Sequence, residues 1–228
     1  EYDHVFYTET RSEGNLYYVH PDRGRIDFDV ASEAFMSKLS TKIRSDNMKP
    51  YRVVNADATR WISTGEYIFI LDVANKQYRQ IEIPPASRGK NITRSPLPFL
   101  FGMKAEDAIS RFQLSFGEWH DPENKNKKGA VINVVATPRD PAVAREYNRA
   151  EVIMDANSFL PIHLRIVDPS GNKETVYQFH QVEVGATWLT NPFKVPAFGG
   201  WEKLSDTKAE PEPEPAPRRP VPATPRAQ

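Results

Sequence analysis

The stretch that decides the fold is LPIHLRIVDPSGNKETVYQFHQV, which spans Leu160–Val182. Its side chains alternate on both sides of a turn, with Ile162, Leu164 and Ile166 between His163, Arg165 and Val167, and with Tyr177 and Phe179 beside Gln178 and His180. Asp168-Pro169-Ser170-Gly171-Asn172 supplies the turn residues. A period of two predicts two half-buried antiparallel strands. One face of this sheet is apolar and carries no catalytic group, which favours holding an apolar molecule over covalent chemistry.

The composition excludes several classes of protein. Lys and Arg balance Asp and Glu at 30 each, so no overall field attracts nucleic acid or an acidic lipid surface. Cysteine is absent from the 228 residues, which excludes disulfides, thiolate metal sites and a cysteine nucleophile. The sequence contains no apolar run near the ~20 residues that span a bilayer, so no transmembrane segment is expected.

The ends of the chain differ in character. The first residues, Glu1-Tyr2-Asp3, are already strand-like and lack methionine, so we expect a processed chain whose export signal lies upstream. The last segment, SDTKAEPEPEPAPRRPVPATPRAQ at 205–228, is rich in Pro and charge and carries almost no large apolar side chain. Such a segment cannot offset its ordering entropy by burial, so a disordered, extended tail is predicted. Residues 1–204 are predicted to form one domain.

This domain is predicted to be mainly β, because short alternating segments and turn residues follow one another at the spacing of a sandwich or barrel. The expected strands are Tyr2–Thr10, Gly14–His20, Gly24–Val30, Tyr51–Asn55, Thr59–Ser63, Glu66–Val73, Lys76–Ile83, Phe112–Glu118, Ala130–Thr137, Arg149–Asp155, Pro161–Val167 and Lys173–Val182. The pair Glu13-Gly14 is among the expected turns. Ala31–Lys49 is expected to be irregular, with a helical turn near Glu33–Leu39.

Short helices are expected in the middle of the chain. Ser95-Pro96 can cap and start one, and Gly102 can close it. A second is predicted at Ala105–Arg111, and a third begins at Asp140-Pro141 and runs to about Tyr147. The first is unusually apolar, with Leu97, Phe99, Leu100, Phe101 and Met103. It is either a plug that fills the core or a movable lid over an apolar cavity.

The sequence indicates no catalytic or metal site. The five histidines form no zinc-binding spacing, and neither a nucleophile elbow nor a phosphate-binding glycine loop is present. Glu118-Trp119-His120-Asp121 leads into a Lys- and Asn-rich stretch and is predicted to be a solvated turn. We therefore expect no enzyme activity, no cofactor and no bound nucleic acid.

The order of features along Tyr2–Glu202 resembles the periplasmic lipoprotein carriers LolA and LolB and their relatives. The matching elements are Glu13-Gly14, His20-Pro21 followed by Arg25-Ile26-Asp27, Arg60-Trp61-Ile62, Tyr67–Asp72, Lys76-Gln77-Tyr78, Ser95–Leu100, Thr137-Pro138-Arg139, the turn at Asp168–Asn172 and Asn191-Pro192-Phe193. The chain departs from the carriers at His20, where they have arginine, and at Gly24, where they have an apolar residue. It also lacks their first helix, which we expect to lie upstream, and adds the segment 31–49 and the tail.

The resemblance implies an incomplete antiparallel β-barrel of about 11–12 strands, with short helices as a lid over a hydrophobic cavity. The cavity wall would consist of Phe69, Leu114, Phe116, Ile132, Val134, Val152, Met154, Ile162, Leu164, Ile166, Tyr177 and Phe179. The lid would consist of Leu97, Phe99, Leu100, Phe101, Met103 and Ile109.

The function that follows is non-enzymatic binding and carriage of a lipid or lipoprotein acyl group in the periplasm or cell envelope, by a monomer. An envelope protein is a further expected partner. The alternative is a sensor or interaction domain on the same fold, in which these side chains fill the core and the rim or the tail binds a partner.

Overall fold

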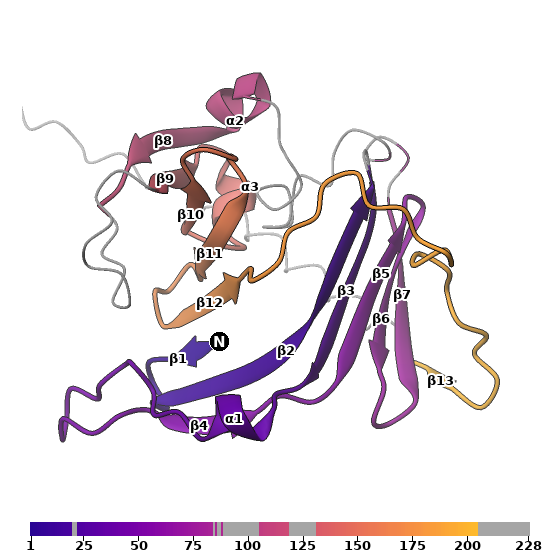
Figure 1. Ribbon diagram of the computed structural model, residues 1–228, viewed down its shortest axis with the longest axis horizontal. Helices are drawn as coiled ribbons and strands as arrows, with labels where there is room; N and C mark the ends of the chain where they lie inside the picture. Colours follow the sequence, from indigo (N-terminus) through magenta and orange to yellow (C-terminus); the bar gives the residue numbers. More distant parts are fainter. Residues whose placement is uncertain (20–21, 84, 86–87, 89–104, 119–130, 205–228) are drawn as a thin grey trace, which may run out of the picture.

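The computed structural model describes all residues except 20–21, 84, 86–87, 89–104, 119–130 and 205–228 (Figure 1). Its strands are β1 (Tyr2–Asp3), β2 (Thr8–Val19), β3 (Arg23–Val30), β4 (Arg52–Asn55), β5 (Thr59–Thr64), β6 (Tyr67–Asp72), β7 (Gln77–Glu82), β8 (Phe112–Phe116), β9 (Val131–Pro138), β10 (Arg149–Asp155), β11 (Pro161–Val167), β12 (Lys173–Gln178) and β13 (Glu202–Lys203). Its helices are α1 (Glu33–Met36), α2 (Ala105–Arg111) and α3 (Pro141–Ala144).

All strands belong to one open sheet in the order β13-β7-β6-β5-β3-β2-β1-β12-β11-β10-β9-β8, with β4 added beside β2. The strand β2 joins two wings, because Thr8–Arg11 pairs with β1 and β4 and Ser12–Val19 pairs with β3. We call β3, β5, β6, β7 and β13 the N-terminal wing, and β1 with β8 to β12 the C-terminal wing. The strands β8 and β13 end the sheet without pairing to each other, so the predicted mainly β, unclosed architecture is confirmed.

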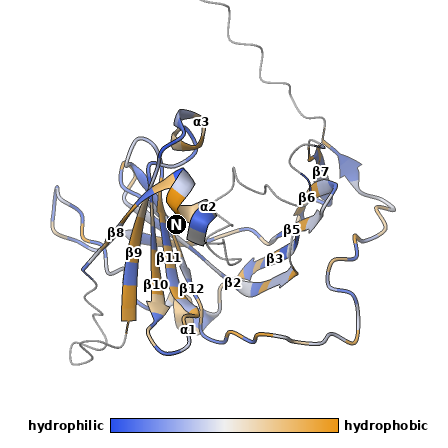
Figure 2. Ribbon diagram, turned by 90° about the horizontal axis from the view of Figure 1, so that it is seen from above, coloured by the Kyte–Doolittle hydropathy of each residue, from blue (hydrophilic) through white to orange (hydrophobic). Residues whose placement is uncertain are grey.

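The two wings meet at an angle, so the sheet has an inner and an outer face (Figure 2). The helix α1 and the segment that follows β12 lie on the outer side of the bend (Figure 2). We call this segment, residues 180–201, the strap. It crosses the outer face of the N-terminal wing and ends in β13, which pairs in parallel with β7 through Glu202↔Gln77 and Lys203↔Tyr78. The sequence did not predict β13, because two exposed residues show no periodicity.

The register of the C-terminal wing confirms the alternation from which the fold was inferred. One row of opposed residues crosses five strands: Phe116, Val134, Val152, Leu164 and Tyr177. A second row consists of Leu114, Ala136, Ala150, Ile166 and Thr175. Since directly opposed residues point to the same side of a sheet, both rows lie on one apolar face.

The predicted turn at Glu13-Gly14 is wrong, and so is the strand Tyr2–Thr10. The chain turns earlier, where Asp3 Oδ1 accepts hydrogen bonds from Val5 N and Phe6 N, each at 2.9 Å. Gly14 instead lies within β2, opposite Phe28. A Cβ on Gly14 would sit 1.7 Å from the carbonyl oxygen of Asp27. This glycine permits close approach of β3 and does not turn the chain.

The helices α1 and α3 lie where the sequence predicts helical segments, but both are shorter than predicted. The Ser32 hydroxyl caps α1, accepting from Phe35 N, and Asp140 caps α3, accepting from Ala142 N. The third helix ends at Ala144, three residues before the predicted end, and Tyr147 is buried in the core at 1% exposure. The second helix has the predicted bounds. The predicted helix after Ser95-Pro96 and the predicted disordered tail lie outside the described residues.

Two hydrophobic clusters lie on opposite faces of the sheet. The first packs Phe112, Ala136, Tyr147, Ala150, Val152, Leu164 and Ile166 on the inner face of the C-terminal wing, with Val143, Met154, Tyr177 and Phe179 at its margin. The second packs Ile62, Phe69 and Leu71 against the strap residues Val195, Phe198 and Trp201. The ring of Phe198 stacks on Tyr78 with centroids 3.8 Å apart. Burial of these aromatic side chains fixes the strap to the outer face.

Candidate apolar binding face

The predicted wall residues of the C-terminal wing do share one face. Phe116, Val134, Val152, Leu164 and Tyr177 form a cross-strand row. Leu114 and Ile166 stand in the next row, and Ile132 is opposite Met154. Ile162 and Phe179 belong to the same alternating sets as Leu164 and Tyr177. The sequence therefore predicted correctly that these residues share one face, and their role as the wall of a ligand cavity stays a prediction.

The N-terminal wing supplies a second wall, which sequence analysis did not name. Strand pairing places Leu16, Ile26, Trp61 and Ile70 in one row and Tyr18, Ser63, Ile68 and Ile81 in another. Counted along β2, these rows lie on the same face as the apolar rows of the C-terminal wing. The sequence signal for this wall was the alternation of side chains in TRWIST (Thr59–Thr64) and YIFILD (Tyr67–Asp72). It separates two sets of side chains without indicating which set faces inward.

The two walls meet at an aromatic contact. The ring of Phe28, from β3, lies 6.4 Å from that of Tyr177, from β12, and 6.3 Å from that of Trp61. Phe28 and Tyr177 are 149 positions apart in the sequence, so only folding brings these rings together. Aromatic rings at such distances interact favourably. The contact joins the apolar side chains of the two wings at Phe28 and Tyr177.

Phe69 is the one predicted wall residue that lies elsewhere. It stands in the row of Arg25, Ile62 and Gln80, on the outer face, and packs against Phe198 at a centroid distance of 5.8 Å. Its assignment to the cavity wall is therefore wrong. The physical reason is that the strap covers the outer face of this wing, so the wing carries apolar side chains on both sides.

The inner face is filled in one part and open in another. Val152, Leu164 and Ile166 are buried at 6%, 0% and 8% exposure, beneath Tyr147 and the side chains around it. The exposed fraction is higher on the edge strand β8, at 38% for Leu114 and 86% for Phe116, and in the N-terminal wing, at 39% for Trp61 and 37% for Ile81. This difference means that part of the predicted wall is core and part is free to contact a ligand.

Of the predicted lid, Ile109 lies on α2 and is 62% exposed. The other five lid residues, Leu97, Phe99, Leu100, Phe101 and Met103, lie outside the described residues. The choice between a plug and a lid accordingly stays a prediction.

A buried hydroxyl interrupts the filled part of the inner face. Tyr147 Oη has no hydrogen-bond partner within the described part of the chain. Burial raises the pKa of Tyr147 to about 12, and the charge of Glu146 adds to this effect. The hydroxyl therefore stays protonated at neutral pH, where it is a donor without an acceptor.

The outer face of the C-terminal wing carries an ion cluster centred on Glu174. Its carboxylate accepts from Arg165 Nη2 at 2.7 Å and Nε at 2.9 Å, and Lys42 Nζ lies 3.2 Å away. His4 Nε2 is 3.0 Å from the same carboxylate. Burial by itself would raise the pKa of Glu174, but the hydrogen bonds and charges of Arg165 and Lys42 outweigh it and hold the pKa at about 2. The cluster ties β11 and β12 to the loop before β4.

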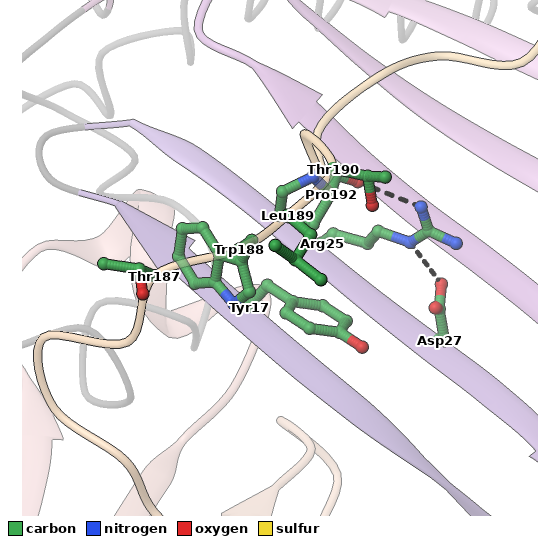
Figure 3. A pocket seen from close by; sticks show the side chains of 8 residues that line it. All are labelled: Tyr17, Arg25, Asp27, Thr187, Trp188, Leu189, Thr190 and Pro192. Carbon is green, nitrogen blue, oxygen red and sulfur yellow. Dashed lines mark hydrogen bonds and ion pairs between the residues drawn. The ribbon is translucent and has the colours of Figure 1, made fainter.

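A pocket of about 410 Å³ lies beneath the strap on the outer face (Figure 3). Arg25 spans it, donating to Asp27 Oδ1 at 2.8 Å and to the carbonyl oxygen of Pro192 at 2.9 Å. Trp188 stands edge-on to Tyr17 with centroids 6.2 Å apart. The hydrogen bond from Arg25 to Pro192 helps to hold the strap. Because Arg25 and Asp27 form an ion pair, their charges cancel and leave no net charge for a ligand.

Neither a metal-binding cluster nor a membrane-spanning helix occurs among the described residues. No group of three or more His, Asp or Glu side chains there could hold a metal ion. No helix among them is long and apolar enough to cross a membrane.

Comparison with known proteins yields distant structural matches alone. No protein-family model and no curated protein matches the sequence. Among the solved structures, one chain in the complex of the CwlD amidase from Clostridioides difficile with the GerS lipoprotein matches at 10% identity and a TM-score of 0.34, covering 76% of this chain and 84% of that chain. A domain assigned to outer membrane lipoprotein sorting in Vibrio parahaemolyticus matches at 14% identity and a TM-score of 0.30, covering 70% of this chain and 57% of that chain. Similarities this low support no conclusion about family or function.

Proposed function

We propose that the protein binds the acyl chain of a lipid or lipoprotein on the inner face of its sheet, without covalent chemistry. The observation that carries the proposal is the pair of apolar walls joined at Phe28 and Tyr177, with partly exposed side chains at their margins. Large apolar surfaces left open on a soluble domain are typical of binding sites. An acyl chain is long, narrow and flexible, and suits a surface whose polar groups are few.

The affinity available from such a surface is adequate for reversible carriage. Each buried CH₂ group contributes about 0.8 kcal/mol. About ten covered methylene groups would contribute about 8 kcal/mol, the free energy of a complex with a micromolar Kd. No polar contact is required, so ligands with different head groups would be accepted. Such a carrier would act in the periplasm or cell envelope, receiving and releasing acylated molecules.

The test is uptake of a fluorescent fatty acid by the full chain, together with native mass spectrometry after expression in a bacterial envelope. Phe116→Glu is the site variant, because Phe116 is 86% exposed and its replacement leaves the packed core intact. Leu189→Glu is the matched control, since Leu189 is fully exposed on the strap. The proposal requires saturable uptake that Phe116→Glu weakens and Leu189→Glu preserves. A clean apo mass with no uptake would refute it.

A second candidate is an interaction or sensor domain whose inner face is core. The burial of Val152, Leu164 and Ile166 beneath Tyr147 favours it. Under this alternative no acyl mass co-purifies and the probe is not taken up, while an envelope protein binds the rim of the sheet or the Pro-rich tail.

A further inference from the structure

We propose that one end of the molecule docks on the surface of an anionic lipid bilayer. This end, which we call the tip, consists of the turn between β1 and β2 (residues 3–7) and the loop leading into β4 (residues 38–52). Figure 1 shows both segments at the lower left, where the loop before β4 projects from the sheet. The proposal does not depend on acyl binding at the inner face.

The two segments form a single surface. Tyr7 Oη and Ser45 Oγ are 3.0 Å apart, and Arg52 N donates to the carbonyl oxygen of Tyr7 at 2.9 Å. The guanidinium of Arg44 lies 4.8 Å from the centre of the Tyr7 ring, and the Tyr51 ring is 5.4 Å from it. Tyr7 therefore holds the turn and the loop against each other.

Apolar side chains are exposed on both segments of the tip. Phe6 is 75% exposed and Val5 55% on the turn, and Met48 is 76% exposed and Ile43 47% on the loop. Backbone hydrogen bonds support these positions: Arg44 N donates to the Lys49 carbonyl at 2.8 Å, and Met48 N donates to the Arg44 carbonyl at 3.1 Å. Leu39, on the same loop, is 78% exposed. Scattered single apolar residues are ordinary on a surface, whereas five on two adjoining segments form an insertion surface.

The tip is also locally basic. The tip contains Lys38, Lys42, Arg44, Lys49 and Arg52 against the two acids Asp3 and Asp46, within a chain whose net charge is zero. Lys42 is paired with Glu174 at 3.2 Å and Arg44 with Asp46 at 2.6 Å. Within the described part of the chain, Lys49 and Arg52 have no carboxylate partner, and both are exposed. Their charges remain available to an external anion.

A bilayer with anionic head groups matches both properties at once. Apolar side chains of turns enter the boundary between head groups and acyl chains, while neighbouring cations stay at the negatively charged surface. The absence of an overall positive charge does not oppose this, because screening limits the relevant field to about 8–10 Å. The whole chain has no net charge, but the tip offers a local basic and apolar surface to acidic lipid.

The experiment is sedimentation of the full chain with vesicles of two parts phosphatidylcholine to one part phosphatidylglycerol, and with vesicles of phosphatidylcholine alone. The apolar variant is Phe6→Ser with Met48→Asn, because Met48 has a φ of 59° that asparagine accepts. The charge variant is Lys49→Glu with Arg52→Glu. The matched controls on the strap are Leu189→Ser and Lys194→Glu, which change exposed residues away from the tip.

We expect sedimentation with the anionic vesicles that falls as salt is raised, and much less with the neutral vesicles. Each double variant should partition at least about tenfold more weakly, with the controls unchanged. Thermal denaturation of each variant establishes that its fold is retained. Failure of the unaltered chain to sediment with anionic vesicles would overturn the proposal. Equal binding to both vesicle types, or equal loss in tip and control variants, would overturn it as well.

Discussion

The Glu174 ion cluster provides the most quantitative test of the fold. Glu174→Gln keeps the size of the side chain and removes its charge. Arg165, which now donates two hydrogen bonds to the carboxylate at 2.7 Å and 2.9 Å, would face a neutral amide that offers one acceptor oxygen. Lys42 at 3.2 Å would lose its counter-ion. The variant should therefore be less stable than the unaltered protein at neutral pH.

The magnitude follows from burial and partial solvent screening. Removing one partner of a fully buried ion pair costs about 3–5 kcal/mol. The Glu174 side chain is 8% exposed, but its partners Arg165 and Lys42 are 32% and 36% exposed, so water reorganises around them. We expect a loss of about 2 kcal/mol in the free energy of unfolding. For a chain of this size that corresponds to a Tm about 4–8 °C lower.

The pH dependence has a definite sign. The pKa of Glu174 is lowered in the folded protein, from its ordinary value of 4.5 to about 2. The unfolded chain therefore binds a proton first as the pH falls, so the stabilisation is present above about pH 5 and disappears toward pH 2. The difference in stability between the unaltered protein and Glu174→Gln should shrink across the same interval.

Urea denaturation at a series of pH values between neutral and acidic measures this difference directly. Glu202→Gln is the control, because Glu202 is exposed on β13 and its removal should change stability by less than about 0.5 kcal/mol. The reasoning is refuted if the stability difference at Glu174 stays constant over the acidic range, or if it is absent at neutral pH.

Three further substitutions test other parts of the fold. Gly14→Ala would place a Cβ 1.7 Å from the Asp27 carbonyl oxygen, so we expect a loss of about 3 kcal/mol or more in thermal denaturation, and an unchanged Tm would contradict the close approach of β2 and β3. Tyr147→Phe removes a buried hydroxyl without a partner among the described residues, and it should raise stability by about 1 kcal/mol; a comparable loss would mean that the hydroxyl is paired. Phe198→Ala removes the ring stacked 3.8 Å from Tyr78, so limited proteolysis should cut the strap faster, and unchanged cleavage would argue against its anchoring role.

The sequence was sufficient to predict the apolar face of the C-terminal wing. Leu164 and Ile166 alternate with His163 and Arg165. Because successive side chains of a strand point to opposite faces, the two apolar side chains must lie on the same, buried face of the sheet. The antiparallel neighbours then follow from short turns. The register that aligns Val134, Val152 and Leu164 agrees with that expectation.

The remaining features depend on contacts between distant parts of the chain. Alternation cannot indicate which face of β6 is inward, and the side chain of Phe69 was assigned to the wrong one because the strap that covers it follows more than a hundred residues later. A glycine such as Gly14 is equally compatible with a turn and with close strand approach. The second wall around Trp61 becomes evident once the bend of the sheet brings Phe28 to Tyr177.

The most direct measurement of the central claim is photo-crosslinking with a diazirine-bearing fatty acid, followed by mass spectrometry of the labelled peptides. Acyl binding on the inner face predicts labels on the strands that carry Trp61, Ile81 and Phe116, and these labels should disappear when unlabelled fatty acid is added in excess. Labels confined to the strap, or labels that excess fatty acid does not displace, would contradict it.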